Sequence, residues 1–111
     1  MSPTITHRFT YILSTSWNKP VNSVIFNISR YGKHTHRIDF PEPVSFADAV
    51  IEVQRFLCAP IDNDYYDRVK DDLFHNIRHF YIIRGDCLGD CKFLERVREV
   101  EPGVVKFWCG S

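Results

Sequence analysis

The sequence predicts one α+β domain over residues 1–111, with a mixed or antiparallel sheet of about five strands and two helices on one face. Three observations lead to this class. Short β-branched and aromatic segments lie at both ends of the chain, two segments with helical apolar spacing lie between them, and Gly or Pro separates the segments. A chain of this length falls within the range of ~100–200 residues for one domain. The expected element order is β-β-β-α-α-β-β.

The N-terminal third predicts three strands. Residues 8–13 and 24–28 are rich in β-branched and aromatic side chains, and a Tyr-Gly-Lys turn precedes a third apolar alternation at 36–40. The second and third segments therefore form a hairpin. Pro41 and Pro43 cannot donate to a sheet ladder, so we expect the sheet to end there.

Two helices follow. Ser45 is a good N-cap, Asp48 can complete a capping box, and an apolar stripe continues to a stop at residues 58–60. The second helix is expected to begin near Asp62 or Asn63 and to continue to about residue 80. Its stripe consists of Tyr66, Val69, Leu73, Ile77 and Phe80.

The C-terminal segment predicts two more strands. Residues 93–100 fit a helix or a strand, and we favour a strand because the turn at 101–103 and the strand predicted at 104–108 suggest a hairpin. Because both ends of the chain contribute strands, we expect N- and C-terminal segments to pair in one cooperative unit.

Charge and composition limit the partners. The formal net charge is zero, which argues against a protein that coats nucleic acid. Residues 1–40 hold five Lys and Arg against one Asp, however, whereas residues 41–111 hold nine against thirteen Asp and Glu. Such a dipolar chain could associate head to tail or bind a charged partner on one face.

The N-terminal residues lack the pattern of a secretory signal. We therefore expect an intracellular protein, in the cytoplasm or nucleus of the expressing cell or in a virion. Its four cysteines are then reduced. No apolar run approaches the ~18–20 residues that cross a bilayer, so no membrane partner is expected.

Two polar sets suggest binding sites. Zinc takes four nitrogen or sulfur ligands, and four such residues cluster in sequence: His75, His79, Cys87 and Cys91. On the expected helix the two histidines face away from the apolar stripe, so the alternative is an exposed helix face with cysteines buried elsewhere.

The hairpin tip combines cations with an aromatic ring and is the candidate contact for nucleic acid, through Arg30, Tyr31, Lys33 and Arg37. The alternative there is a solvated turn.

Catalysis has little support. The chain has no nucleophile elbow, Gly-rich phosphate loop or HExxH motif, so we expect a non-enzyme.

The aromatic content of 14% exceeds the evident needs of the core, which favours a self-associating protein-interaction or assembly module. The candidate interface residues are Phe74, Tyr81, Tyr65, Phe56 and Trp17, and an unpaired edge strand is a second route to self-association. The alternative is a zinc-stabilised or nucleic-acid-contacting accessory protein.

Three segments of the chain carry a resemblance. Residues 65–75, 84–91 and 109–111 are similar to segments of small proteins of unassigned role encoded by large DNA viruses. The resemblance covers about the last two thirds of the chain. It implies a viral origin and favours a virion component or a host-directed interaction protein over a metabolic enzyme.

Overall fold

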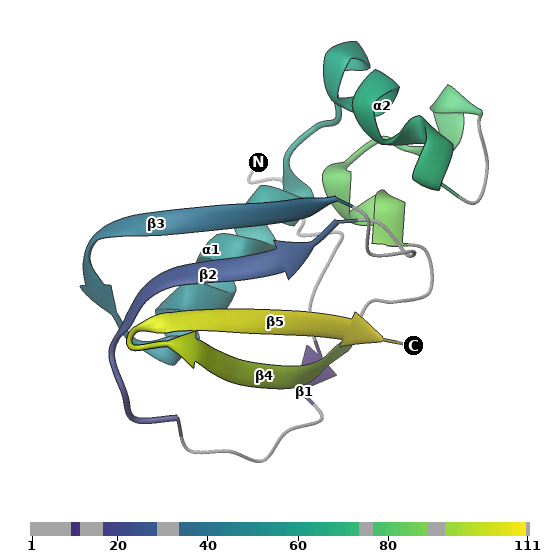
Figure 1. Cartoon of the computed structure of the whole chain (residues 1–111). Coiled ribbons are helices and arrows are strands. Elements are labelled where there is room, and N and C mark those ends of the chain that lie inside the picture. The colour runs from purple at the N-terminus through teal and green to yellow at the C-terminus, as the bar shows by residue number, and fades with distance from the viewer. Residues whose placement is uncertain (1–9, 12–16, 29–33, 74–76, 89–92, 111) are drawn as a thin grey trace, which may run out of the picture.

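The computed structural model describes residues 10–11, 17–28, 34–73, 77–88 and 93–110, and a mixed β-sheet organises this part of the chain (Figure 1). Its four long strands are β2 (Val21–Asn27), β3 (Thr35–Val44), β4 (Phe93–Glu101) and β5 (Val104–Gly110). Of the expected first strand, only Thr10–Tyr11 is described; it forms a two-residue β1 parallel to the start of β4. The α+β class and the mixed sheet are confirmed, whereas the sheet has four substantial strands and not five.

Two hairpins build the sheet, and a parallel pair joins them. β2 pairs antiparallel with β3, β4 pairs antiparallel with β5, and the central pair β2–β5 is parallel, in the order β1-β4-β5-β2-β3. The predicted pairing of N- and C-terminal segments is thus confirmed. The ambiguous segment 93–100 is a strand, as favoured.

The β4–β5 turn also holds the start of β2. Gly103 has a φ of 78°, and its carbonyl accepts hydrogen bonds from the backbone N–H groups of Asn22 and Ser23 at 2.7 and 3.1 Å. A Cβ on Gly103 would lie 2.1 Å from Asn22 Nδ2. Only glycine fits this turn without strain.

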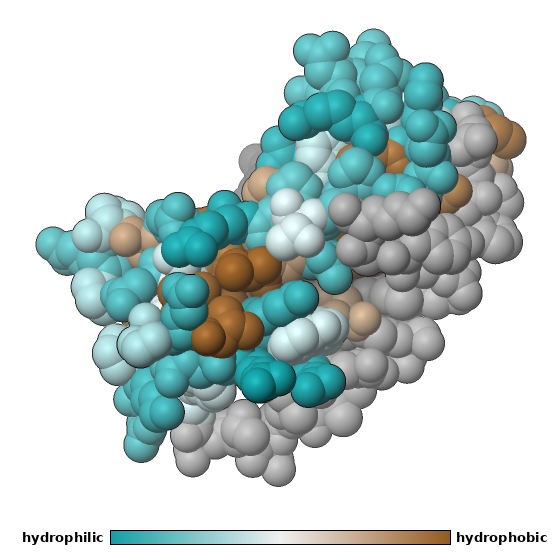
Figure 2. Space-filling view, in the orientation of Figure 1, coloured by the Kyte–Doolittle hydropathy of each residue, from teal (hydrophilic) through white to brown (hydrophobic). Residues whose placement is uncertain are grey.

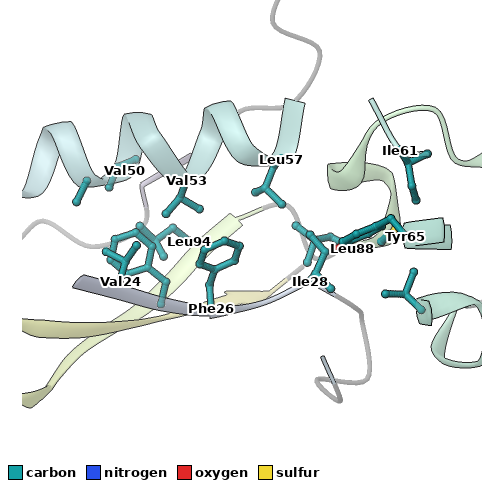
Figure 3. Close-up of a cluster of buried hydrophobic side chains, with 14 of the residues drawn as sticks. Val24, Phe26, Ile28, Val50, Val53, Leu57, Ile61, Tyr65, Leu88 and Leu94 are labelled. Atoms are coloured by element: carbon teal, nitrogen blue, oxygen red, sulfur yellow. The ribbon is translucent and has the colours of Figure 1, made fainter. Parts of the chain in front are cut away.

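Helix α1 (Phe46–Cys58) forms where predicted. The Ser45 hydroxyl accepts a hydrogen bond from Asp48 N at 3.2 Å, which caps the helix. In Figure 3, Val50, Val53 and Leu57 of α1 point onto Val24, Phe26 and Leu94 of the sheet. This apolar layer is the main core, and burial of each such side chain contributes about 1.5–3 kcal/mol.

Strand β3 passes through the prolines that we expected to end the sheet. It continues to Val44, which pairs with Val21, after a break in register that follows the Ser23–Asp39 pair. β3 is the edge strand of the order, so a proline there can direct its missing N–H to solvent and cost no ladder bond. The expectation that Pro41 and Pro43 end the sheet is wrong.

The second helix is much shorter than expected. α2 covers Asn63–Val69 and is followed by three 3₁₀ turns: η1 (Lys70–Asp72), η2 (Arg78–Phe80) and η3 (Arg84–Leu88). The regular helical backbone stops at Asp72, which is buried with Oδ2 2.7 Å from His34 Nε2, and the backbone is extended at Leu73.

A hydrogen-bonded loop replaces the rest of that helix. The backbone of residues 59–61 bonds to that of residues 82–84, and Asp86 accepts from the N–H groups of Ile82 and Ile83 at 2.9 and 3.0 Å. The two distal residues of the expected stripe, Ile77 and Phe80, are 46% and 50% exposed. The tertiary contacts of this segment therefore override its helical spacing.

The two helices do not share one face of the sheet. Figure 1 shows α1 behind the strands, whereas α2 lies beyond the ends of β2 and β3. In Figure 3 the apolar cluster continues past the sheet from Ile28 to Leu88, Tyr65 and Ile61. Because only α1 covers the sheet in the described part of the chain, its other face is open.

Candidate functional site

The open face of the sheet is defined by the strand registers. Directly paired residues on neighbouring strands point to the same side. One row across the sheet consists of Arg37, Ile25, Lys106 and Arg98, because each is paired with the next. The adjacent row contains the pairs Thr35–Asn27 and Arg96–Trp108. The two rows are about 6.6–6.8 Å apart, because neighbouring residues on one face are two positions apart along a strand.

The strand residues between these rows face α1. Val24, Phe26, Val105 and Phe107 have exposed fractions of 0–1%, whereas Ile25, Lys106 and Trp108 are partly exposed and Arg37, Arg96 and Arg98 are exposed. Figure 2 looks onto the open face and shows apolar surface over β2 and β5 between hydrophilic surfaces over β3 and β4. An apolar centre with a polar margin on an uncovered sheet is typical of a binding surface.

Trp108 is the aromatic centre of this face. The guanidinium carbon of Arg96 lies 4.8 Å from the ring centroid, and Lys106 Nζ lies 4.9 Å from it. Both are cation–π contacts. They hold the two cations beside the ring, so less side-chain entropy is lost when an anion binds there.

Cations and acids are segregated on the open face. Arg96, Arg98 and Lys106 make no ion pair within the ranges that the structure describes. The acids lie in a third row, in which Asp39 is paired with Ser23, and Val104 with Glu101. Three positive charges without an ion-pair partner among the described residues therefore surround Trp108 and Ile25.

Arg37 differs from these three cations because it has an anionic partner. Its Nε donates to Asp39 Oδ1 at 2.8 Å, and the Ser23 hydroxyl donates to the same oxygen at 2.6 Å. The hydrogen bonds from Ser23 and Arg37 lower the pKa of Asp39, and the bond to Asp39 raises that of Arg37. Asp39 remains ionised at neutral pH and reduces the charge that Arg37 can offer to a ligand.

This arrangement suits a flexible polyanion. Guanidinium and ammonium groups bind phosphate or carboxylate oxygens, and an aromatic ring among them can stack on a planar group. The predicted nucleic-acid contact is the hairpin tip, and of its residues Arg37 lies on the open face. Arg30, Tyr31 and Lys33 lie outside the described residues. The other residues of the open face were not predicted from the sequence, although a spacing of two within each predicted strand was a signal: Arg96 and Arg98, Lys106 and Trp108.

Of the five predicted interface residues, two belong to the core. Tyr65 and Tyr81 are 3% and 5% exposed, so their side chains do not lie on a surface that a partner could contact. Phe56 packs partly against the core, and Trp17 stacks on Phe46 at 5.8 Å between ring centroids. Phe74 lies outside the described residues.

The two predicted zinc ligands that the structure describes differ in their exposure to solvent. His79 is exposed beside Phe80, and it does not lie on a long helix because α2 ends at Val69. Cys87 is buried, and burial raises the pKa of its thiol to about 12. His75 and Cys91 lie outside the described residues, and no group of three potential metal ligands occurs within those residues.

The comparisons with known proteins place the chain in no family. No helix in the described segments has the length and apolar character needed to span a membrane. The viral resemblance stays a prediction. Comparison of the chain with protein-family models, with curated proteins and with solved structures finds no match.

Proposed function

We propose that this protein is a non-catalytic binding module that takes single-stranded nucleic acid on the open face of its sheet. The observation that carries the proposal is Trp108, which lies beside Arg96 and Lys106 on the face of the sheet opposite α1. Single-stranded nucleic acid supplies a chain of phosphates for the cations and unpaired bases for the ring.

The charge of the face favours this ligand over a second copy of the same face. Two open faces in contact through their cation rows would oppose Arg96, Arg98 and Lys106 to the same three cations of the second copy, and like charges in contact are unfavourable. A duplex fits less well, because its stacked bases do not present a free ring to Trp108. A flexible single strand can follow the two rows of the sheet.

Fluorescence anisotropy with a labelled single-stranded oligonucleotide tests the proposal. Three phosphate contacts predict a slope of about −2 for log K against log salt concentration, at about −0.7 per phosphate. The double variant R96Q/R98Q should reduce the magnitude of the slope to about 0.7. Trp108→Ala should weaken binding about 5- to 150-fold, because stacking contributes about 1–3 kcal/mol per base.

Arg55→Gln is the matched control. Arg55 is exposed on α1, its Nη1 lies 2.8 Å from Glu52 Oε1, and its loss changes net charge away from the open face. Equal losses in R55Q and R98Q would show unspecific attraction and contradict the proposal. Tighter binding of an acidic polypeptide than of the oligonucleotide would contradict it too, and would assign the face to an acidic protein.

The sheet edge supports a second proposal, which is self-association. β3 is the last strand of the order, and its residues before Pro41 offer an edge for pairing with a second copy. An antiparallel pair about a twofold axis normal to the sheet would place both open faces on one side. Native mass spectrometry should then find a dimer that Ile38→Pro disrupts, provided that circular dichroism shows the variant still folded; a wild-type monomer at micromolar concentration would contradict this proposal.

A further inference from the structure

A second group of cationic side chains, packed among aromatic rings, lies at the end of the sheet near α2 and η3. We call this group of cations and rings the Arg84 cluster, and its members come from four elements: His36, Phe56, Tyr65, Arg68 and Arg84. Because His36 and Arg37 are consecutive in a strand, they point to opposite faces. The cluster is therefore separate from the open face.

Arg84 is held by aromatic rings and, among the described residues, has no anionic partner. Its guanidinium carbon lies 4.2 Å from the centroid of Phe56 and 5.2 Å from that of Tyr65, and its backbone N donates to Ala59 O at 3.0 Å. Within the described residues its side chain makes no hydrogen bond or ion pair, and its Nε is buried without a partner. A half-buried guanidinium without an anion is unfavourable, so the position favours a ligand that supplies one.

The neighbours of Arg84 add positive charge. The guanidinium carbon of Arg68 lies 5.4 Å from the centroid of Tyr65 and, within the described chain, also has no ion pair. His36 Nε2 lies 3.0 Å from the Tyr65 hydroxyl, and its ring stacks on Tyr65 at 5.7 Å. Burial lowers the pKa of His36, and the charges that lower it further, from Arg84, Arg68 and His34, are all positive.

Two buried or half-buried acids of this region, Asp72 and Asp86, are engaged within the fold. Asp72 is bound to His34, and Asp86 accepts from two backbone N–H groups. Two arginines beside a tyrosine hydroxyl and a histidine nitrogen supply several donors and two positive charges. A phosphate monoester, with three oxygens and close to two negative charges at neutral pH, matches that set better than a single carboxylate.

We propose that Arg84 and Arg68, held against the ring of Tyr65, bind a phosphate group. Arg84 is the fixed cation, because its guanidinium already stacks on Phe56. Arg68 is exposed and closes on the anion from α2. The phosphate is either that of a small phosphate monoester or the terminal phosphate of an oligonucleotide.

Titration of the full chain with inorganic phosphate in chloride buffer tests the proposal, with histidine ring signals followed by NMR. Phosphate should raise the pKa of His36, because it neutralises the cations beside that ring. Arg84→Gln should weaken phosphate binding about tenfold or more, because charge-assisted hydrogen bonds are lost. Arg84→Lys keeps the charge and much of the packing but loses the planar donors, so it should also bind more weakly while remaining folded.

Arg98→Gln separates this site from the open face. It should leave phosphate binding at Arg84 unchanged, and a loss equal to that in Arg84→Gln would overturn the proposal. A His36 pKa that does not change when phosphate is added would also overturn the proposal. Equal phosphate affinity of Arg84→Lys and the wild type would overturn it as well. Tighter binding of a 5′-phosphorylated oligonucleotide than of its 5′-hydroxyl form, lost in Arg84→Lys, would identify the terminal phosphate; binding of a nucleoside monophosphate without that difference would identify a small ligand.

Discussion

Arg78 and Arg84 are six residues apart and have opposite surroundings. The Arg78 guanidinium donates to the carbonyl oxygens of Ile61 and Tyr81 and to Asn63 Oδ1, so its hydrogen-bonding capacity is used within the fold. The Arg84 guanidinium contacts rings and, in the described chain, has no acceptor. Arg78 therefore holds the loop after α2 against residue 61, whereas Arg84 remains able to bind a ligand.

At the same scale, His36 predicts a pH dependence of stability. Its pKa is lowered in the folded chain, first by burial, so below about pH 6.5 the unfolded chain binds this proton more readily. The stability that neutral His36 supports is complete above that pH and is lost as the pH falls toward its folded pKa. In phosphate-free buffer, the urea midpoint should fall less between about pH 7.5 and pH 5 in His36→Gln than in the wild type.

His79→Gln is the matched control for that measurement, because His79 is exposed. In His79→Gln, the difference between the urea midpoints at about pH 7.5 and pH 5 should equal that of the wild type. An equal pH dependence in His36→Gln and the wild type would show that the lowered pKa of His36 does not contribute.

At the scale of elements, local pattern decides some segments and tertiary contact decides others. The alternation at 24–28, 36–40 and 104–108 predicted strands that formed, and the cap and stripe of residues 45–58 predicted α1. The prediction of a long second helix was wrong because the helical spacing continues in the sequence past Asp72, whose buried side chain contacts His34, the residue before β3. A single-sequence pattern carries no signal for that long-range contact.

The β4–β5 turn gives a prediction for one element. Gly103→Ala should destabilise the protein by about 1–2 kcal/mol, because the left-handed backbone disfavours an L side chain and the new Cβ meets Asn22. Denaturant unfolding measures the change. In an Asn22→Ala background most of the steric part should disappear, because only the contact with Cβ at 3.3 Å is left, and the backbone part should remain. An unchanged midpoint for Gly103→Ala would contradict the turn geometry.

At the scale of the whole molecule, charge matters by face and not by total. The net charge of zero argued against contact with nucleic acid, yet acids and cations occupy different rows of one sheet face. Strand alternation could have predicted which residues share that face. It could not predict that the face is open, because this depends on where α2 lies, nor that His36, Tyr65 and Arg84 meet, because they come from three distant segments.

The most direct measurement of the central proposal is an amide chemical-shift map of the labelled protein titrated with a single-stranded oligonucleotide. The shifts should concentrate at Ile25, Arg96, Arg98, Lys106 and Trp108, the Trp108 indole N–H should shift with them, and the exposed residues of α1 should stay unchanged. Absence of shifts on β4 and β5, or larger shifts on α1 than on the open face, would contradict the proposal.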